Sequence, residues 1–171
     1  MNTANKLTML RVILIPVYLV LMYLGYTYVA LAVFIIASVT DFVDGYIARH
    51  YNQTTDFGKF MDPLADKVLV LTAMIYFCSV GVLPAWSLVI VMAREFAVSG
   101  LRMVAVDNGR VIAAGWSGKV KTFSTMVCLC IMHLPLPGWL VWVCVAVISA
   151  TTLYSGVEYF VKNKDVLNTH K

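Results

Sequence analysis

Residues 12–40 read VILIPVYLVLMYLGYTYVALAVFIIASVT, and this apolar stretch determines the class of fold. It contains no charged side chain and is longer than the roughly 20 residues that one transmembrane helix requires. Gly25 lies near its middle, where a glycine favours a turn. The stretch therefore predicts two apolar helices joined by a turn near residue 26.

Two further uncharged stretches, residues 68–93 and 122–157, have the same organisation. Glycine and proline interrupt each of them, close to residues 82 and 136. We therefore predict an all-α integral membrane protein with six transmembrane helices in three hairpins. The length of the chain favours a single domain over residues 1–171.

The composition excludes several other classes of protein. Hydrophobic residues make up 61% of the 171 residues and charged residues 13%, against about 25% charged in ordinary soluble domains. A soluble globular protein and a disordered chain are both excluded. The net charge of +4 is spread along the chain, so we expect no nucleic-acid partner and a lipid bilayer as the environment.

The basic residues are distributed asymmetrically. All 13 Lys and Arg residues lie outside the three uncharged stretches, and none is near a predicted turn. Under the positive-inside rule, the three turns face outward and the N- and C-termini are cytoplasmic. Charged side chains at the cytoplasmic helix ends are costly in lipid, so we expect them to line a cavity open to the cytoplasmic side.

Cysteine and histidine give no sign of a zinc site or a disulfide framework. The four cysteines lie in apolar stretches without CxxC spacing, and we interpret them as apolar packing residues. His133 lies beside a predicted outer turn, and we expect it to be interfacial rather than catalytic.

Acidic residues are concentrated in one segment, since five of the nine lie between residues 41 and 66. Asp41 and Asp44 are three apart, and Asp62 and Asp66 are four apart, so each pair shares a helix face. Two carboxylates about 5 Å apart repel by roughly 3 kcal/mol at an effective dielectric constant of about 20. Protons or metal ions must therefore compensate for the negative charge of the four carboxylates. An oxygen-only ligand set suits Mg²⁺ or Mn²⁺, and two such ions can hold a phosphate and its attacking oxygen.

The same segment resembles the signature of a known family. The spacing Asp41-x2-Asp44-Gly45-x2-Ala48-Arg49-x8-Gly58-x3-Asp62-x3-Asp66 is similar to that of the CDP-alcohol phosphatidyltransferases. The resemblance implies six membrane helices, a homodimer and transfer of a phosphatidyl group from CDP-diacylglycerol with release of CMP.

The resemblance also implies roles for individual residues. Asp41, Asp44 and Asp62 correspond to metal ligands, and Asp66 to a catalytic general base that also contacts a metal ion. Residues expected to bind the nucleotide or the CDP-lipid are Asp41, Asp44, Gly45, Ala48, Arg49, Thr8 and Gly58. An arginine at position 49 offers a fork of donors to a diphosphate, and a glycine at position 45 lets a nucleotide approach the helix backbone.

Outside the signature, the chain resembles one branch of this family, whose acceptor is sn-glycerol 3-phosphate. The resemblance rests on residues 5–16, 93–95, 99–102 and 118–122. An acceptor that carries its own phosphate requires fixed cations. The residues expected to bind that phosphate are Arg94, Arg102, Arg110, Lys119 and Lys121. Lys119 and Lys121 cannot face one cavity equally on a helix, and we favour Lys119 because it follows Gly118.

Other functions remain open at this stage. Within the family, the alternatives are a cardiolipin synthase or a phosphatidylinositol-phosphate synthase. From a different class, a small ion-coupled membrane transporter would also place acids at a membrane boundary. An aspartate-rich membrane prenyltransferase would need two DDxxD-like clusters, which the chain lacks. For the family, we expect a multi-pass protein of a bacterial cell membrane with its active site facing the cytoplasm.

Overall fold

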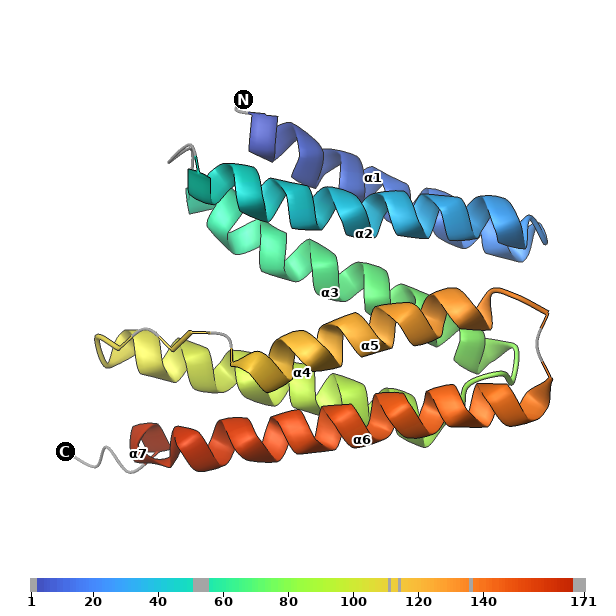
Figure 1. Cartoon of the computed structure of the whole chain (residues 1–171). Helices are drawn as coiled ribbons and strands as arrows, with labels where there is room; N and C mark the ends of the chain where they lie inside the picture. The colour runs from blue at the N-terminus through green and yellow to red at the C-terminus, as the bar shows by residue number, and fades with distance from the viewer. Residues whose placement is uncertain (1–2, 51–55, 111, 114, 136, 168–171) are drawn as a thin grey trace. The chain divides into compact units, whose positions relative to one another are not determined.

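The computed structural model describes residues 3–50, 56–110, 112–113, 115–135 and 137–167, and it describes their side chains except at 3–8, 41–50, 56–66 and 167. Every regular element in this part of the chain is helical, which confirms the all-α prediction. The helices are α1 (Thr3–Tyr23), α2 (Thr27–His50), α3 (Asp56–Ser79), α4 (Ala85–Asp107), α5 (Trp116–Met132), α6 (Gly138–Lys162) and α7 (Lys164–Leu167). Figure 1 labels these helices and colours them along the chain, from blue at the N-terminus to red at the C-terminus.

The helix ends lie where the turn signals predict them. Gly25 separates α1 from α2 with φ at +81°, and Gly81 separates α3 from α4 with φ at +75°. Residues that have a side chain rarely adopt this left-handed backbone conformation, so glycine is favoured at both turns. Pro84 and Pro137 are the extended residues directly before α4 and α6. Proline has no amide hydrogen to donate and suits a helix start.

The chain forms two compact units, and the first consists of Met1–Ser79 together with His133–Pro135. In this unit α1 packs against both α2 and α3. Its core contains the rings of Tyr18, Phe34, Phe77 and His133. The hydroxyl of Tyr18 lies 3.0 Å from Nε2 of His133. The His133 ring contacts all three aromatic rings, with centroids 4.9 to 5.7 Å away.

The prediction that His133 is interfacial is therefore wrong. Its side chain is only 3% exposed, although it follows α5 closely in the chain. Aromatic packing and a hydrogen bond to Tyr18 provide the partners that a buried imidazole needs. The residue is part of the core of the first unit.

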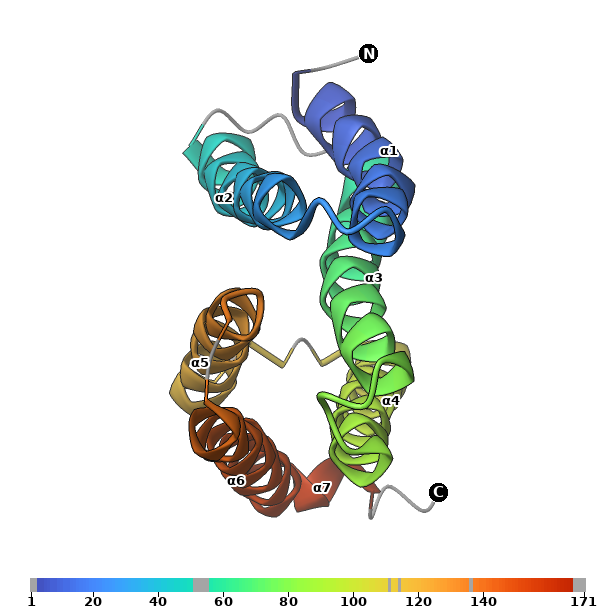
Figure 2. The same cartoon turned by 90° about the vertical axis from the view of Figure 1, so that its right-hand side faces the viewer.

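The second unit contains α4 to α7, that is, Val80–Met132 and Leu136–Lys171. Here α6 packs against α4 and α5, and α7 packs against α4; both views show α5 alongside α6 (Figures 1 and 2). Ser87 of α4 meets Ser149 of α6 at 3.1 Å between hydroxyl oxygens. Small polar residues of this kind allow close approach of apolar helices. One apolar cluster of the unit consists of Val98, Leu101, Ala105, Tyr159 and Val166.

Among the described residues, one helix is both long and apolar enough to cross a membrane, and it is α6. Shorter apolar helices cover Met9–Tyr23, Thr27–Thr40 and Lys67–Ser79. The helical class of the fold is thus established, whereas six membrane crossings remain a prediction.

Candidate active site

The two predicted acid pairs lie on helices of the same unit. Asp41 and Asp44 belong to the backbone of α2, and Asp62 and Asp66 to that of α3. The two helices pack together and run in opposite directions (Figure 1). Asp44 is six residues before the end of α2 (50 − 44), and Asp62 is six residues after the start of α3 (62 − 56). At about 1.5 Å per residue, these two backbone positions lie at similar depth along the helix pair.

The other predicted nucleotide-binding positions share this end of the unit. Gly45, Ala48 and Arg49 belong to the last turns of α2, and Gly58 to the first turn of α3. Thr8 belongs to α1, which packs on both helices. The side chains of all the signature residues lie outside those that the structure describes. Their roles in binding metal and nucleotide therefore stay predictions.

A set of four aspartates fits a hard divalent cation, because carboxylate oxygens are the ligands that Mg²⁺ and Mn²⁺ prefer. The described side chains contain no other group of three or more His, Cys, Asp or Glu residues that could hold a metal ion. The family whose signature this segment resembles is generally dependent on divalent metal. The acid pairs of α2 and α3 are accordingly the candidate metal ligands.

Arg11 is a buried charge that the sequence analysis did not assign to the site. It belongs to α1, and only 1% of it is exposed. A buried guanidinium is tolerated only where anionic or polar groups compensate it. Arg11 directly precedes the first apolar stretch, so it resembled a topology marker. Arg11 is buried in α1, which packs on α2 and α3. It is therefore a structural part of the first unit, which carries the four aspartates.

A largely buried charge cluster in the second unit contains two of the five predicted acceptor-binding residues. Nη1 of Arg94 donates to Oε1 of Glu95 at 3.0 Å, and Nζ of Lys121 donates to the same oxygen at 2.6 Å. The side chains of Arg94, Glu95 and Lys121 are 13%, 12% and 5% exposed. Two cations from α4 and α5 thus share one carboxylate. The preference for Lys119 over Lys121 differs from this arrangement, because Lys121 is the residue that joins the cluster.

Small residues make room for the Arg94 side chain. Nη2 of Arg94 donates to the hydroxyl of Ser155 at 2.5 Å. A Cβ atom at Gly156 would lie 3.3 Å from Cγ of Arg94, and one at Gly118 would lie 3.4 Å from Nη2. The first distance is tighter than an ordinary contact, and the second is at the lower limit of one. Glycines of α5 and α6 therefore lie beside the Arg94 side chain, where a larger residue would crowd it.

Arg102 occupies a second position on α4, eight residues after Arg94. Its Nε donates to the hydroxyl of Tyr159 at 2.9 Å, and its guanidinium carbon lies 5.5 Å from the centre of that ring. Tyr159 is buried, with 6% exposed. This stacking and bonding fixes the orientation of Arg102 at the α4–α6 contact.

The remaining two predicted residues lie apart from this cluster. Arg110 forms an exposed ion pair with Asp165 of α7, and the side chains are 52% and 57% exposed. The hydrogen bond from Arg110 lowers the pKa of the Asp165 carboxyl below its ordinary value. Lys119 is exposed, and its Nζ lies 5.9 Å from the Trp116 ring centre. Arg110 and Lys119 therefore have surface partners, whereas Arg94, Arg102 and Lys121 point into the unit.

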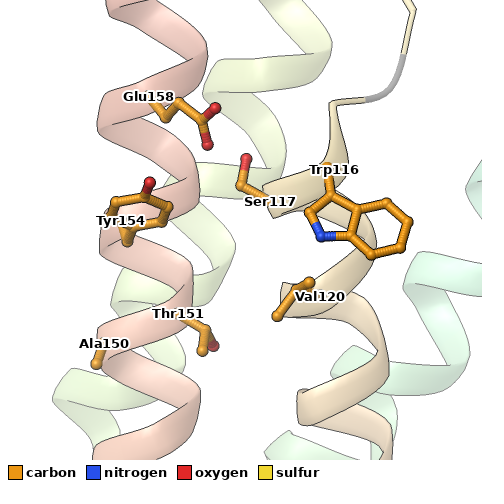
Figure 3. Close-up of a pocket in the computed structure, with 7 residues that line it drawn as sticks. All are labelled: Trp116, Ser117, Val120, Ala150, Thr151, Tyr154 and Glu158. Atoms are coloured by element: carbon orange, nitrogen blue, oxygen red, sulfur yellow. The ribbon is translucent and has the colours of Figure 1, made fainter.

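A cavity of about 410 Å³ lies between α5 and α6 (Figure 3). Glu158 and Ser117 lie at one end of it, and Ala150 lies at the other. The complete lining is Trp116, Ser117, Val120, Ala150, Thr151, Tyr154 and Glu158. None of the five predicted basic residues is among them, and its single carboxylate would repel a phosphate. The cavity is therefore a poor candidate for acceptor binding.

Comparison with known proteins agrees with the signature. Residues 1–154 match the family model described as CDP-alcohol phosphatidyltransferase. This match covers α1 to α5 and most of α6, so it includes both the acid pairs and the buried basic cluster.

Three bacterial relatives match over most of their own length. The chain is 39% identical to a CDP-diacylglycerol–glycerol-3-phosphate 3-phosphatidyltransferase of Bacillus subtilis, with 98% of each chain covered. It is 41% identical to a probable phosphatidylglycerophosphate synthase of Mycobacterium tuberculosis, over 92% of this chain and 79% of the relative. It is also 41% identical to a CDP-diacylglycerol–glycerol-3-phosphate 3-phosphatidyltransferase of Escherichia coli, over 82% of this chain and 77% of the relative.

Proposed function

Because this chain belongs to the CDP-alcohol phosphatidyltransferase family, we propose that it transfers a phosphatidyl group from CDP-diacylglycerol to sn-glycerol 3-phosphate. The products are phosphatidylglycerophosphate and CMP. Relatives at 39–41% identity carry names for this reaction and support the choice of acceptor. The enzyme would act in the synthesis of phosphatidylglycerol and cardiolipin.

The observation that carries the proposal is the buried basic cluster of α4 and α5. The phosphate of the acceptor is an anion, and holding it away from bulk water requires fixed cations. Arg94 and Lys121 share the Glu95 carboxylate, and Arg102 is oriented by Tyr159. A free polyol would have no use for three largely buried cations. We assign phosphate binding to Arg94, Arg102 and Lys121, and a peripheral role to Arg110 and Lys119.

We assign donor binding to the α2–α3 pair. Asp41, Asp44 and Asp62 would hold divalent cations, with Asp66 as a further ligand. When bound, such ions supply neutralising charge for the diphosphate of the donor. Arg49 would contact the diphosphate, and Gly45 and Ala48 would leave space for the nucleotide. Thr8 and Gly58 complete the proposed donor site.

The reaction then requires one proton acceptor from the chain. Asp66 takes the proton of the terminal hydroxyl of glycerol 3-phosphate as that oxygen attacks the β-phosphorus of CDP-diacylglycerol. The new bond joins the acceptor oxygen to phosphorus, and the bond from phosphorus to the bridging oxygen breaks. The electron pair leaves with CMP. General-base assistance of this kind typically contributes about 10²–10⁴-fold in rate.

We further propose that α1 to α6 all cross the membrane, with both termini in the cytoplasm. Each carries exposed large apolar side chains of the kind that lipid covers. Examples, all 51–71% exposed, are Ile13, Ile36, Ile75, Val89, Phe123 and Trp142. Tyr26→Cys and Val82→Cys, in a background without native cysteines, should react with an impermeant maleimide outside intact cells. Asn108→Cys should react only after permeabilisation, and external labelling of it would refute this topology.

The family resemblance also supports a homodimer. Multi-angle light scattering of the detergent-solubilised protein should give twice the mass of one chain. A mass of one chain under conditions that retain activity would argue against the dimer.

The function is tested with purified protein, CDP-diacylglycerol and a panel of acceptors. CMP release should be fast with glycerol 3-phosphate and at least about 100-fold slower with glycerol, because the phosphate contacts are lost. Inositol phosphate and phosphatidylglycerol should be poor acceptors. Preference for either would reassign the chain to one of the alternative synthases. Absence of CMP release with every acceptor would favour the transporter alternative.

A further inference from the structure

Glu95 has no role in the proposed chemistry, yet it is the residue on which the basic cluster depends. α4 contains one other acidic residue, Asp107, which is exposed. The Glu95 side chain is 12% exposed, and its carboxylate accepts hydrogen bonds from Arg94 of α4 and Lys121 of α5. Lys121 lies 26 residues further along the chain. An acid of ordinary surface function would not be held between two cations with so little of its side chain exposed.

The carboxylate brings together charges that would otherwise separate. Arg94 and Lys121 reach the same oxygen, Oε1, at 3.0 and 2.6 Å, so their charged nitrogens lie close together. Like charges at this separation repel strongly where water is largely excluded. With Glu95 neutral, the lysine side chain would gain by turning away from the guanidinium. Glu95 therefore fixes the relative position of the two cations.

The cluster keeps unused capacity to bind an anion. A guanidinium has five N–H donors and an ammonium has three. Nη1 of Arg94 is used by Glu95 and Nη2 by Ser155, while its buried Nε has no acceptor among the described residues. Two cations against one carboxylate also leave a net positive charge. The cluster is therefore oriented but not saturated.

We propose that Glu95 is a positioning residue that holds Arg94 and Lys121 ready for the phosphate monoester of the acceptor. This inference rests on the proposed function and adds the determinant of its acceptor specificity. Ser155 and the glycines at 118 and 156 hold the other side of Arg94. Glu95 itself does not contact the acceptor, because a carboxylate would repel a phosphate.

The test compares steady-state constants of Glu95→Gln with those of the unmodified enzyme. Glutamine keeps the size but removes the charge, so the KM for glycerol 3-phosphate should rise about tenfold. The KM for CDP-diacylglycerol and the activity with plain glycerol should change less than threefold. Glu95→Asp should recover part of the loss. Asp107→Asn makes the same change of charge on the same helix and should leave all constants unchanged.

A double-mutant cycle with Lys121→Met keeps the inference testable if one variant is poorly folded. In the Lys121→Met background, Glu95→Gln should raise the acceptor KM less than threefold, because one of the two cations that Glu95 positions is already absent. If the two substitutions raise the acceptor KM by factors that simply multiply in the double variant, the inference is overturned. A lower acceptor KM in Glu95→Gln would also overturn it, since Glu95 would then be a competitor of the phosphate.

The same measurements distinguish a failure of the proposed function from a failure of the role assigned to Glu95. If the unmodified enzyme does not use glycerol 3-phosphate, the proposed function is wrong. If it does, and Glu95→Gln loses only thermal stability with an unchanged acceptor KM, the proposed function stands and Glu95 is merely structural.

Discussion

The two units of the chain bury different chemistry. The described core of the first unit is aromatic and aliphatic, and its buried polar side chains are Arg11 and His133. The second unit buries a series of polar side chains, namely Ser87, Lys121, Thr125, Ser149, Thr152, Ser155 and Asn163. Hydrogen bonds between helices follow the α4–α6 contact in order, from Ser87–Ser149 to Arg94–Ser155 and Arg102–Tyr159.

This difference in buried side chains corresponds to the different substrate that each unit is proposed to bind. In the first unit, an apolar core joins the helices that carry the aspartates. The aspartates lie toward the C-terminal end of α2 and the N-terminal end of α3. In the second unit, the hydrogen bonds that join the helices also orient the basic side chains. A change to one of these inter-helix hydrogen bonds should therefore affect packing and acceptor binding together. A change in the aromatic core should affect stability without altering substrate affinity.

The largest effect should come from the acids of the first unit. Asp44→Asn removes a carboxylate proposed to hold the metal ions, and transfer should fall by at least about 10³-fold. CMP release should be measured over a range of Mg²⁺ and Mn²⁺, with chelation by EDTA as the matched control for the unmodified enzyme. Near-normal turnover of Asp44→Asn at saturating metal would remove the metal site from α2.

The next effect separates the buried cations from the exposed one. Arg94→Ala and Lys121→Ala should each raise the acceptor KM by about one to two orders of magnitude, since a charge-assisted contact contributes roughly 1.5–3 kcal/mol. Lys119→Ala should change it less than threefold, because Lys119 is exposed beside Trp116. If Lys119→Ala has the larger effect, the assignment of the phosphate site to the buried cluster is wrong.

A smaller effect is expected from the aromatic core. Tyr18→Phe deletes the hydroxyl that meets Nε2 of His133 and leaves a buried imidazole nitrogen without it. The free energy of unfolding should drop by about 1–3 kcal/mol, which thermal unfolding in detergent would detect. Both KM values should be unchanged. An altered acceptor KM in this variant would break the division between the two units.

The smallest effect concerns the exposed pair of Arg110 and Asp165. The arginine lowers the pKa of the Asp165 carboxyl, so the pair contributes to stability above the ordinary aspartate pKa of about 3.9. The contribution disappears as the pH falls through the lowered pKa of the folded state. Asp165→Asn should remove this part of the pH dependence of thermal unfolding. An equal loss at pH 3 and pH 6 would contradict the ion-pair explanation.

The sequence predicted the parts of the molecule that depend on local spacing. The turns at Gly25 and Gly81 follow from backbone conformation, and the acid pairs follow from helical periodicity. The position of Lys121 depends instead on Glu95, a residue on another helix, and local spacing does not reveal this ion pair. The burial of His133 was missed because its partners Tyr18, Phe34 and Phe77 are distant in the chain. Such pairings arise from packing and have no signature in local sequence.

We propose that the first unit binds the donor and that the second unit binds the phosphate of the acceptor. The most direct test measures both KM values for Arg49→Ala and Arg102→Ala. Arg49→Ala should raise the KM for CDP-diacylglycerol by about tenfold or more and leave that for glycerol 3-phosphate within threefold. Arg102→Ala should raise the KM for glycerol 3-phosphate by about tenfold or more and leave that for CDP-diacylglycerol within threefold. If both variants raise the same constant, the assignment of the two substrates to the two units is contradicted.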